Sequence, residues 1–226
     1  MAKPAVIVVG ADKGGVGKTF VSRAVLSYLE DRGVRTRAFD TENETPNGVL
    51  RRFHPDAELV DLTHSDGQVA VFDALPLAPV TLIDIRAGLL SRCIKDLAEL
   101  GFLEMAREGK IDITVLHVLG SSVASLNEVA SASSALASAR HFLVTNHIND
   151  ASFFAGISNV PTHVFETHKI IDVPKLDERA AEFVEASSLP FLAFSKDESQ
   201  SLVMRRKVGH WLSLVCTQLD TAKLVA

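Results

Sequence analysis

Short apolar stretches alternate along this chain with longer segments in which apolar residues recur at helical spacing. The apolar stretches cover residues 5–9, 36–39, 80–85, 113–119 and 141–146. Stretches that are apolar at consecutive positions are typical of strands buried on both faces of a parallel sheet. The pattern therefore predicts buried parallel strands at these five places.

Helical spacing marks the segments between the strands. One helix should begin near Lys18 and end at Gly33, and its apolar face consists of Val21, Ala24, Val25, Tyr28 and Leu29. The other expected helices are 89–107, with Gly101 as a candidate break, 122–139 and about 199–224. Residues 149–159 carry the least pattern and should form a loop or a short helix. The alternation of strands and helices predicts an α/β fold with a doubly wound, mostly parallel sheet and helices on both faces.

Length, composition and charge narrow the class of protein. The chain has 226 residues, which favours a single domain, residues 1–226. It carries 23 Lys and Arg against 28 Asp and Glu, so a nucleic-acid contact would need a local basic patch. Cys93 and Cys216 form no spacing motif and are expected to be buried free thiols. No run approaches the ~18 apolar residues of a membrane span. We therefore expect a cytoplasmic protein that does not bind membranes.

A glycine-rich loop between the first strand and the first helix carries the strongest chemical signal. Gly14, Gly15 and Gly17 allow the backbone to curl so that its N–H groups face an anion. The helix that begins near Lys18 adds the positive end of its dipole. Lys18 can reach the β- and γ-phosphates of a nucleotide, and the hydroxyl of Thr19 can bind Mg²⁺. The alternative is a plain glycine-rich turn. It is disfavoured because the strand, the glycines, the Lys-Thr pair and the helix follow one another in the order that a phosphate-binding loop requires.

The loop departs from the common pattern G-x-x-x-x-G-K-[ST], because Asp12 stands in the place of the first glycine and Lys13 follows it. The segment KGGVGKT resembles the signature of the ParA/MinD family of deviant Walker A ATPases. The resemblance implies that Lys13 crosses a dimer interface to the phosphates of the partner subunit, where an extra cation offsets phosphate repulsion. It also implies that the loop binds ATP or ADP through Gly14, Gly15, Val16, Gly17, Lys18, Thr19 and Phe20. Asp12 should face a neighbouring loop, because a carboxylate beside phosphates is unfavourable.

Two acidic positions at strand ends match the later motifs of this family. Asp40 ends the second strand, and the resemblance implies that it orients the attacking water, with Glu42 in the place of a second aspartate. A carboxylate that caps a turn is the alternative for Asp40. Asp84 ends the strand in VTLIDIRAG, where a Mg²⁺ ligand is expected because an unpaired buried carboxylate is costly. Gly88 would let the backbone approach the γ-phosphate, and Arg86 receives no role.

The adenine site is expected further along the chain. Asn146 follows a strand, and the resemblance implies that its amide, which both donates and accepts, reads the adenine edge. A turn-forming asparagine is the alternative. The segment IIDVPKLDERAAEF resembles the family's later strand, which ends in Val-Pro before a helix with an acidic start. Val173 and Pro174 would then line the adenine pocket.

A basic cluster in the last helix consists of Arg205, Arg206 and Lys207. It is either a solvated helix face or a surface for non-specific contact with DNA phosphates. The eight histidines show no zinc-binding spacing, and no G-x-S-x-G elbow is present. The tail has too weak a basic face to resemble a membrane-targeting helix.

Taken with the resemblance, these motifs imply an ATPase switch that uses Mg²⁺. ATP closes a homodimer, and hydrolysis, slow unless a partner protein stimulates it, opens the dimer. The expected output is positioning of a cargo, such as partition of a plasmid or chromosome. Two alternatives stay open: an accessory ATPase of plasmid transfer, and a nucleotide-bound scaffold with little hydrolysis. The absence of C-x-x-C argues against iron–sulfur carriage.

Overall fold

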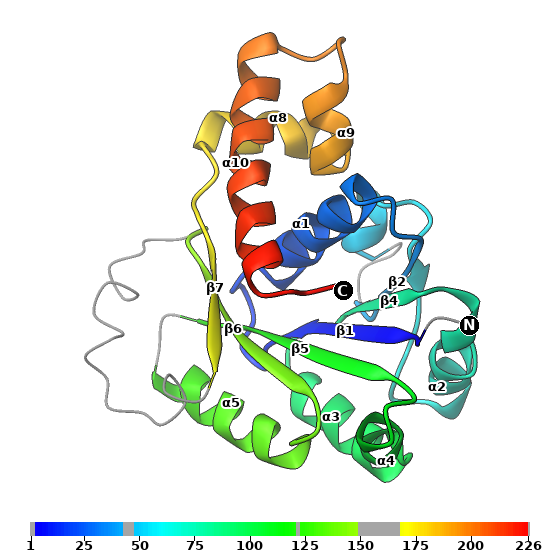
Figure 1. Ribbon diagram of the computed structural model, residues 1–226. Helices are drawn as coiled ribbons and strands as arrows, with labels where there is room; N and C mark the ends of the chain where they lie inside the picture. Colours follow the sequence, from blue (N-terminus) through cyan, green and yellow to red (C-terminus); the bar gives the residue numbers. More distant parts are fainter. Residues whose placement is uncertain (1–2, 43–47, 121–122, 149–167, 226) are drawn as a thin grey trace.

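The computed structural model describes residues 3–42, 48–120, 123–148 and 168–225. These residues form a seven-stranded sheet in the order β3-β2-β4-β1-β5-β6-β7. The strands are β1 Ala5–Gly10, β2 Thr36–Asp40, β3 Glu58–Leu59, β4 Val80–Asp84, β5 Asp112–Val118, β6 Arg140–Asn146 and β7 Lys169–Val173. Every pair of neighbouring strands is parallel. The sheet therefore confirms the predicted doubly wound α/β fold (Figure 1).

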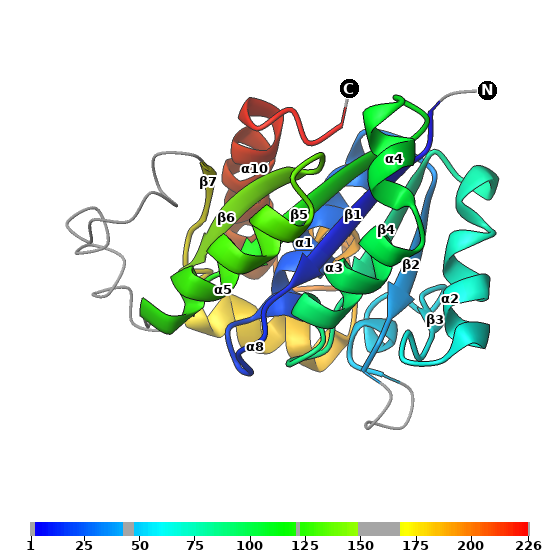
Figure 2. The ribbon, with the colours of Figure 1, turned by 90° about the horizontal axis from the view of Figure 1, so that it is seen from below.

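Helices cover both faces of this sheet (Figures 1 and 2). One face carries α1 Lys18–Asp31, α8 Glu178–Ser187, α9 Phe191–Lys196 and α10 Leu202–Thr221. The other face carries α2 Ser65–Phe72, α3 Leu90–Glu99, α4 Phe102–Arg107 and α5 Val123–Ala135. Two short 3₁₀ helices, η1 Leu50–Arg52 and η2 Leu75–Leu77, lie in the connections around β3 and before β4.

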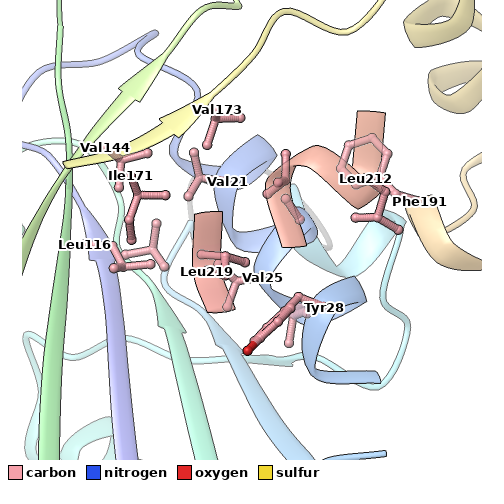
Figure 3. Packing of buried hydrophobic residues seen from close by; sticks show 14 of the residues in the cluster. Val21, Val25, Tyr28, Leu116, Val144, Ile171, Val173, Phe191, Leu212 and Leu219 are labelled. Carbon is pink, nitrogen blue, oxygen red and sulfur yellow. The ribbon is translucent and has the colours of Figure 1, made fainter. Parts of the chain in front are cut away.

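Residues of one strand supply the two cores alternately, because successive side chains point to opposite faces. In β1, Ile7 and Val9 join the core under α1 and α10, whereas Val6 and Val8 join the core under α3. The first core also contains side chains from α1, α9, α10 and the strands beyond β1, among them Val21, Val25, Tyr28, Leu116, Val144, Ile171, Phe191, Leu212 and Leu219 (Figure 3). Burial on both faces explains why the strands are apolar at consecutive positions.

The strands expected from the sequence all form, with ends that differ by one residue at most. The expected helix 89–107 is divided into α3 and α4 at Gly101, whose φ is +82°. The last helix is shorter than expected and runs from Leu202 to Thr221. The sequence did not predict β3, α2 or α9. The loop or short helix expected at 149–159 lies outside the described residues.

The expectation for the two cysteines is met in this part of the chain. Cys93 and Cys216 are buried free thiols, and burial raises the pKa of the Cys93 thiol to about 12. No described helix combines the length and the apolar character that crossing a membrane requires.

Candidate functional site

The glycine-rich loop lies between β1 and α1, at the carboxyl end of the sheet's central strand. Gly15 and Gly17 have φ values of +73° and +86°, a backbone region that other residues rarely adopt. Gly17 occupies the N-cap of α1, and no side chain of the described residues caps this helix start. The first N–H groups of α1 are therefore open to an anion, as the sequence predicts.

The two lysines of the loop have different surroundings. Lys18 is half-buried, and its Nζ donates to the backbone oxygen of Lys13 at 3.4 Å. Burial lowers the pKa of Lys18, although nearby carboxylates, with Asp84 foremost, oppose this shift. Lys13 is exposed, and no carboxylate of the described residues forms an ion pair with it. Lys18 is thus an internal cation of the loop, whereas Lys13 is presented to the outside.

Asp84 lies at the end of β4, beside the first turns of α1. Its carboxylate accepts a hydrogen bond from the Ser22 hydroxyl at 2.9 Å. Burial raises the pKa of Asp84 to about 7, although hydrogen bonds from Thr19 and Ser22 oppose the rise. A buried carboxylate with two hydroxyls beside it is a suitable place for a hard cation with oxygen ligands.

A divalent cation here would depend on more than protein carboxylates. The described residues contain no group of three or more His, Cys, Asp or Glu side chains that could hold a metal. Mg²⁺ commonly takes only one or two protein ligands and completes its coordination with water and phosphate oxygens. The donors present, the carboxylate of Asp84 and the hydroxyl of Thr19, fit such a nucleotide-dependent site.

Asp40 lies at the end of β2 and is 1% exposed. Its Oδ1 accepts from the backbone N–H of Glu42 at 2.9 Å, and its Oδ2 accepts from the backbone N–H of Leu50 at 2.8 Å. Gly48 closes the same loop with φ +69°, and a Cβ at this position would lie 2.4 Å from Oδ2 of Asp40. These are the contacts of a carboxylate that caps a loop, the alternative considered from the sequence. Water orientation by Asp40 stays a prediction.

Thr41 connects the loops that follow β2 and β4, and the sequence analysis missed it. Its hydroxyl donates to the backbone oxygen of Asp84 at 3.1 Å and accepts from the backbone N–H of Arg86 at 2.7 Å. Its own N–H donates to the same oxygen of Asp84 at 3.1 Å. Its position directly after Asp40 could have indicated this role. A threonine that is buried with its neighbouring aspartate must find hydrogen-bond partners for its hydroxyl.

Asp12 points away from the interior of the loop, as expected. Its Oδ1 accepts from the backbone N–H of Ser91 at 3.2 Å, and its Oδ2 accepts from the Ser91 hydroxyl. Ser91 lies in the first turn of α3, where a carboxylate also interacts favourably with the helix dipole. The substitution of the first glycine thus ties the phosphate loop to α3.

Asn146 lies beneath the phosphate loop and is 4% exposed. Its Nδ2 donates to the backbone oxygens of Val16 at 3.1 Å and of Gly17 at 3.4 Å. Its Oδ1 is buried and has no hydrogen-bond partner among the described residues. An unpaired buried acceptor is costly. The exocyclic amino group of adenine is a donor that would satisfy it, and the reading of adenine by Asn146 stays a prediction.

Two further predicted nucleotide residues direct their side chains into the core, and the backbone carbonyl of a third accepts a hydrogen bond within the fold. The ring of Phe20 packs against Phe191 and Trp211, with centroids 5.1 and 5.2 Å apart. Val173 is 1% exposed and belongs to the core under α1. The carbonyl of Pro174 accepts from Nε1 of Trp211 at 2.7 Å. Any share of Phe20 and Val173 in nucleotide binding would therefore come from their backbone atoms.

The three cations of the basic cluster on α10 differ in their exposure and in their partners. Lys207 forms an ion pair with Asp177 at 2.6 Å. Arg205 is half-buried, and its Nε is enclosed without a partner among the described residues. Arg206 is exposed. The three cations therefore do not form one free patch, which favours the solvated helix face over a DNA surface.

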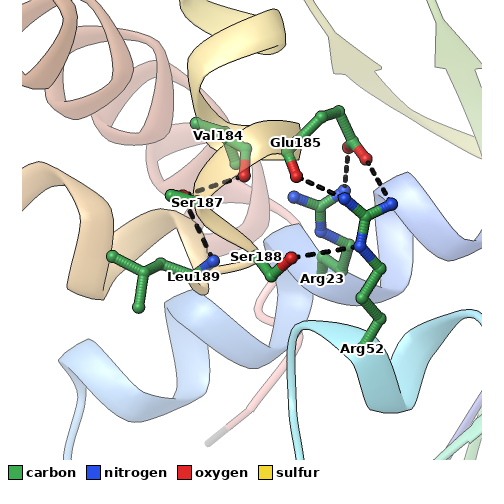
Figure 4. Close-up of polar contacts among 7 residues, drawn as sticks. All are labelled: Arg23, Arg52, Val184, Glu185, Ser187, Ser188 and Leu189. Carbon is green, nitrogen blue, oxygen red and sulfur yellow. Dashed lines mark hydrogen bonds and ion pairs between the residues drawn. The ribbon is translucent and has the colours of Figure 1, made fainter.

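A network of charges joins α1, η1 and α8 (Figure 4). Arg23 of α1 is 3% exposed and donates to Glu185 at 2.6 Å, while its guanidinium stacks on the ring of Phe53. Arg52 also faces Glu185, at 3.7 Å, and donates to the hydroxyl of Ser188 at 3.1 Å. The contacts are not foreseeable from spacing, because the partners are far apart in the sequence. They fix the segment after the Asp40 loop against α8.

Comparison with known proteins adds three findings. Residues 7–188 match the CobQ/CobB/MinD/ParA nucleotide binding domain. A segment of 90 residues is 29% identical to Protein MobD of Acidithiobacillus ferrooxidans and spans 39% of this chain and 39% of that protein. The structure resembles the MinD cell division protein of Aquifex aeolicus with a TM-score of 0.54 and 15% identity, over 96% of this chain and 97% of that one. The last likeness shows a shared fold.

Proposed function

Because the chain belongs to the CobQ/CobB/MinD/ParA nucleotide-binding family, we propose that it is an ATPase switch that dimerises when ATP is bound. The observation that carries this proposal is the difference in burial between the two lysines of the loop. Lys18 lies half-buried inside the loop, where it would meet the phosphates of its own subunit. Lys13 is exposed on the same loop, where it would reach the nucleotide of a second subunit.

The surrounding residues support binding of ATP with Mg²⁺. The uncapped start of α1 would receive the phosphates, and the unpaired Oδ1 of Asn146 would accept the amino group of adenine. Thr19 and Asp84 would hold Mg²⁺, which supplies charge neutralisation at the β- and γ-phosphates when bound. Thr41 keeps the loop after β2 and the loop after β4 in one arrangement, so a change at the phosphates would move both.

The proposal is tested by comparing Lys13→Ala with Lys18→Ala. Lys18→Ala removes a charge-assisted contact worth roughly 1.5–3 kcal/mol, so ATP affinity should fall at least about tenfold in a calorimetric titration. Lys13→Ala should bind ATP almost as wild type does, yet stay monomeric with ATP in light scattering after size exclusion. A wild-type protein that never dimerises with ATP, or a Lys13→Ala variant that dimerises equally well, would contradict the switch.

A second candidate, a nucleotide-bound scaffold with little hydrolysis, is favoured by the contacts of Asp40. Both of its carboxylate oxygens already accept backbone N–H groups, which leaves it less free to orient a water molecule. A turnover assay separates the two candidates. Phosphate release that rises with DNA and a partner protein favours a partition switch, whereas tight ATP binding with negligible release favours the scaffold.

Positioning of a plasmid, chromosome or other cargo is the output that we propose for the switch. DNA contact through Arg205, Arg206 and Lys207 has less support, because Lys207 is paired with Asp177. A gel-shift titration with ATP at low salt tests it. Binding that weakens as salt rises and that Arg206→Glu reduces would support DNA contact, since such contacts are made to phosphates.

A further inference from the structure

Two cavities adjoin at the end of the sheet where the strands begin. The first has a volume of about 710 Å³, and its apolar wall includes Val69, Phe72, Leu75, Leu100, Phe102 and Met105. The second has a volume of about 620 Å³, and its wall includes the cations Lys3, Arg35 and Lys110. Pro4, Pro76 and Lys110 belong to both walls. The two cavities are therefore adjacent, and together they are called the basal groove, with an apolar half and a cationic half.

The basal groove is remote from the nucleotide site. Its wall contains Pro4, which precedes β1, and Ile111, which precedes β5, whereas the phosphate loop follows the other end of β1. The six residues of β1 separate the two ends by about 20 Å at the usual rise per residue. In both ribbon views α2 and α4 lie on the side of the N-terminus, away from the start of α1 (Figures 1 and 2). An occupant of the groove would not compete with nucleotide.

Exposed apolar side chains gather at this groove. Val69 of α2 is 55% exposed, Leu77 of η2 is 64% exposed and Leu100 at the end of α3 is 50% exposed. Val69 and Leu100 line the apolar cavity, and Leu77 lies between Pro76 and Ala78 of the cationic one. Exposed apolar side chains beside a cavity commonly mark an interaction site. A small molecule inside the cavities would leave the exposed residues at the edge in water. A peptide segment that follows the groove would cover both the wall and the edge.

The cationic half indicates the charge of the occupant. Lys3 pairs with Asp112 at 2.6 Å and Lys110 with Glu108 at 2.5 Å, but such exposed pairs are worth little and can exchange partners. Arg35 donates to the backbone oxygen of Leu77 at 2.8 Å, and no carboxylate of the described residues pairs with it. No acidic residue lines this half, whereas Asp73 lies in the wall of the apolar half. On a chain with a net charge of −5, the second half of the groove is a local cluster of three cations, of which Arg35 has no carboxylate partner among the described residues.

We propose that the basal groove docks a peptide segment of a partner protein in which apolar side chains adjoin a run of carboxylates. The apolar side chains enter the half lined by Phe72, Phe102 and Met105. The carboxylates reach Arg35 and Lys3, next to the edge residue Leu77. The partner is held at the end of the sheet opposite the phosphate loop, so it can stay bound whether or not nucleotide is present. This proposal does not depend on ATP hydrolysis or dimerisation.

Fluorescence anisotropy with the full chain and labelled synthetic peptides tests the proposal. The probe carries Leu and Phe side chains beside a run of Glu. One control peptide replaces the Glu run with Lys, and a second replaces the Leu and Phe with Ser. The Glu probe should bind at least about tenfold more tightly than either control, because each control removes one half of the complementarity. Raised salt should weaken the Glu probe without abolishing its binding.

Variants of the protein locate the binding site. Arg35→Glu should weaken binding of the Glu probe at least about fivefold, which is the equivalent of one exposed ion pair. Arg35→Gln should weaken this binding by a smaller factor. Val69→Asp should weaken it about tenfold through loss of one apolar contact. Leu202→Asp is the matched control, because Leu202 is 59% exposed and lies on α10. Arg179→Glu on α8 is the control for charge.

The outcomes separate the proposal from its competitors. No binding of the Glu probe, equal binding of the Glu and Lys peptides, or equal losses in Val69→Asp and Leu202→Asp would overturn it. Self-association of the wild-type chain that Val69→Asp abolishes would also overturn it, because the occupant would then be a second copy. Circular dichroism melts of all variants verify that a lost interaction does not reflect unfolding.

Discussion

Replacement of Asp40 with asparagine should loosen the loop after β2 and lower the stability of the whole domain. The carboxylate accepts two backbone hydrogen bonds, from Glu42 and from Leu50. Asparagine keeps one acceptor oxygen, but it turns an NH₂ donor toward the other backbone N–H. Asp40 is 1% exposed, so water cannot take the place of the lost acceptor.

The magnitude follows from these contacts. A hydrogen bond to a charged acceptor contributes about 1.5–3 kcal/mol, and the unpaired N–H of a buried segment adds to the loss. We expect Asp40→Asn to lower the free energy of unfolding by about 2–3 kcal/mol, which corresponds to about 4–12 °C in Tm for a chain of this length. Urea unfolding followed by circular dichroism measures it. Asp56→Asn, an exposed position in the same connection, is the matched control.

Gly48→Ala provides an independent route to the same loop. Its Cβ would lie 2.4 Å from Oδ2 of Asp40, and its φ is +69°, so alanine should displace the loop while the carboxylate remains. Asp40→Asn with the stability of wild type would refute the loop-capping role. If Asp40 also orients water, Asp40→Asn should lose more ATP turnover than Gly48→Ala at equal nucleotide occupancy.

Three further predictions follow from buried groups. Burial lowers the pKa of His117 to about 3 from an ordinary 6.5, so stability should be full above about pH 6.5 and decline as pH falls toward 3. By pH 5 the loss from this group should reach about 2 kcal/mol in urea unfolding, and His117→Gln should flatten the dependence. Gly17→Ala would place a Cβ 2.2 Å from Nδ2 of Asn146 at φ +86°, so calorimetry should find ATP affinity reduced about tenfold or more. Glu185→Gln leaves the buried Arg23 without its carboxylate, so a thermal melt should indicate a loss of about 1–3 kcal/mol, and an unchanged melt would refute the network's importance.

The sheet could be predicted because its strands obey a local rule. Val6 and Val8 face one core and Ile7 and Val9 the other, so burial on both faces leaves a run of apolar residues that the sequence displays. The short strand β3 has only two residues, both exposed, and leaves no such run. The helix α2 contains Gly67, where a Cβ would lie 2.0 Å from the backbone oxygen of Asp61. The position of α2 depends on this close approach to the segment around Asp61. The spacing of apolar residues along the chain does not indicate such an approach.

In the candidate site, too, local features could be predicted from the sequence and contacts between distant segments could not. Residues within the phosphate loop could be predicted, because glycine backbone freedom and the Lys-Thr pair act over a few positions. The contact between Asp12 and Ser91 crosses 79 positions, and that between Arg23 and Glu185 crosses 162. No spacing rule connects such pairs. Asn146 was predicted as a ligand residue, but its hold on the loop carbonyl of Val16 depends on β6 and β1 ending at the same edge of the sheet.

Trp211 gives the chain a native optical probe. It is the chain's one tryptophan and is 4% exposed, so the protein's tryptophan emission comes from a single dry environment. Its ring touches Phe20 in the first turn of α1, and its indole N–H binds the carbonyl of Pro174 just after β7. A displacement of either segment relative to α10 alters the polarity and quenching around one chromophore. Ligand binding at the start of α1 can therefore be followed in real time on the unlabelled, unmodified protein.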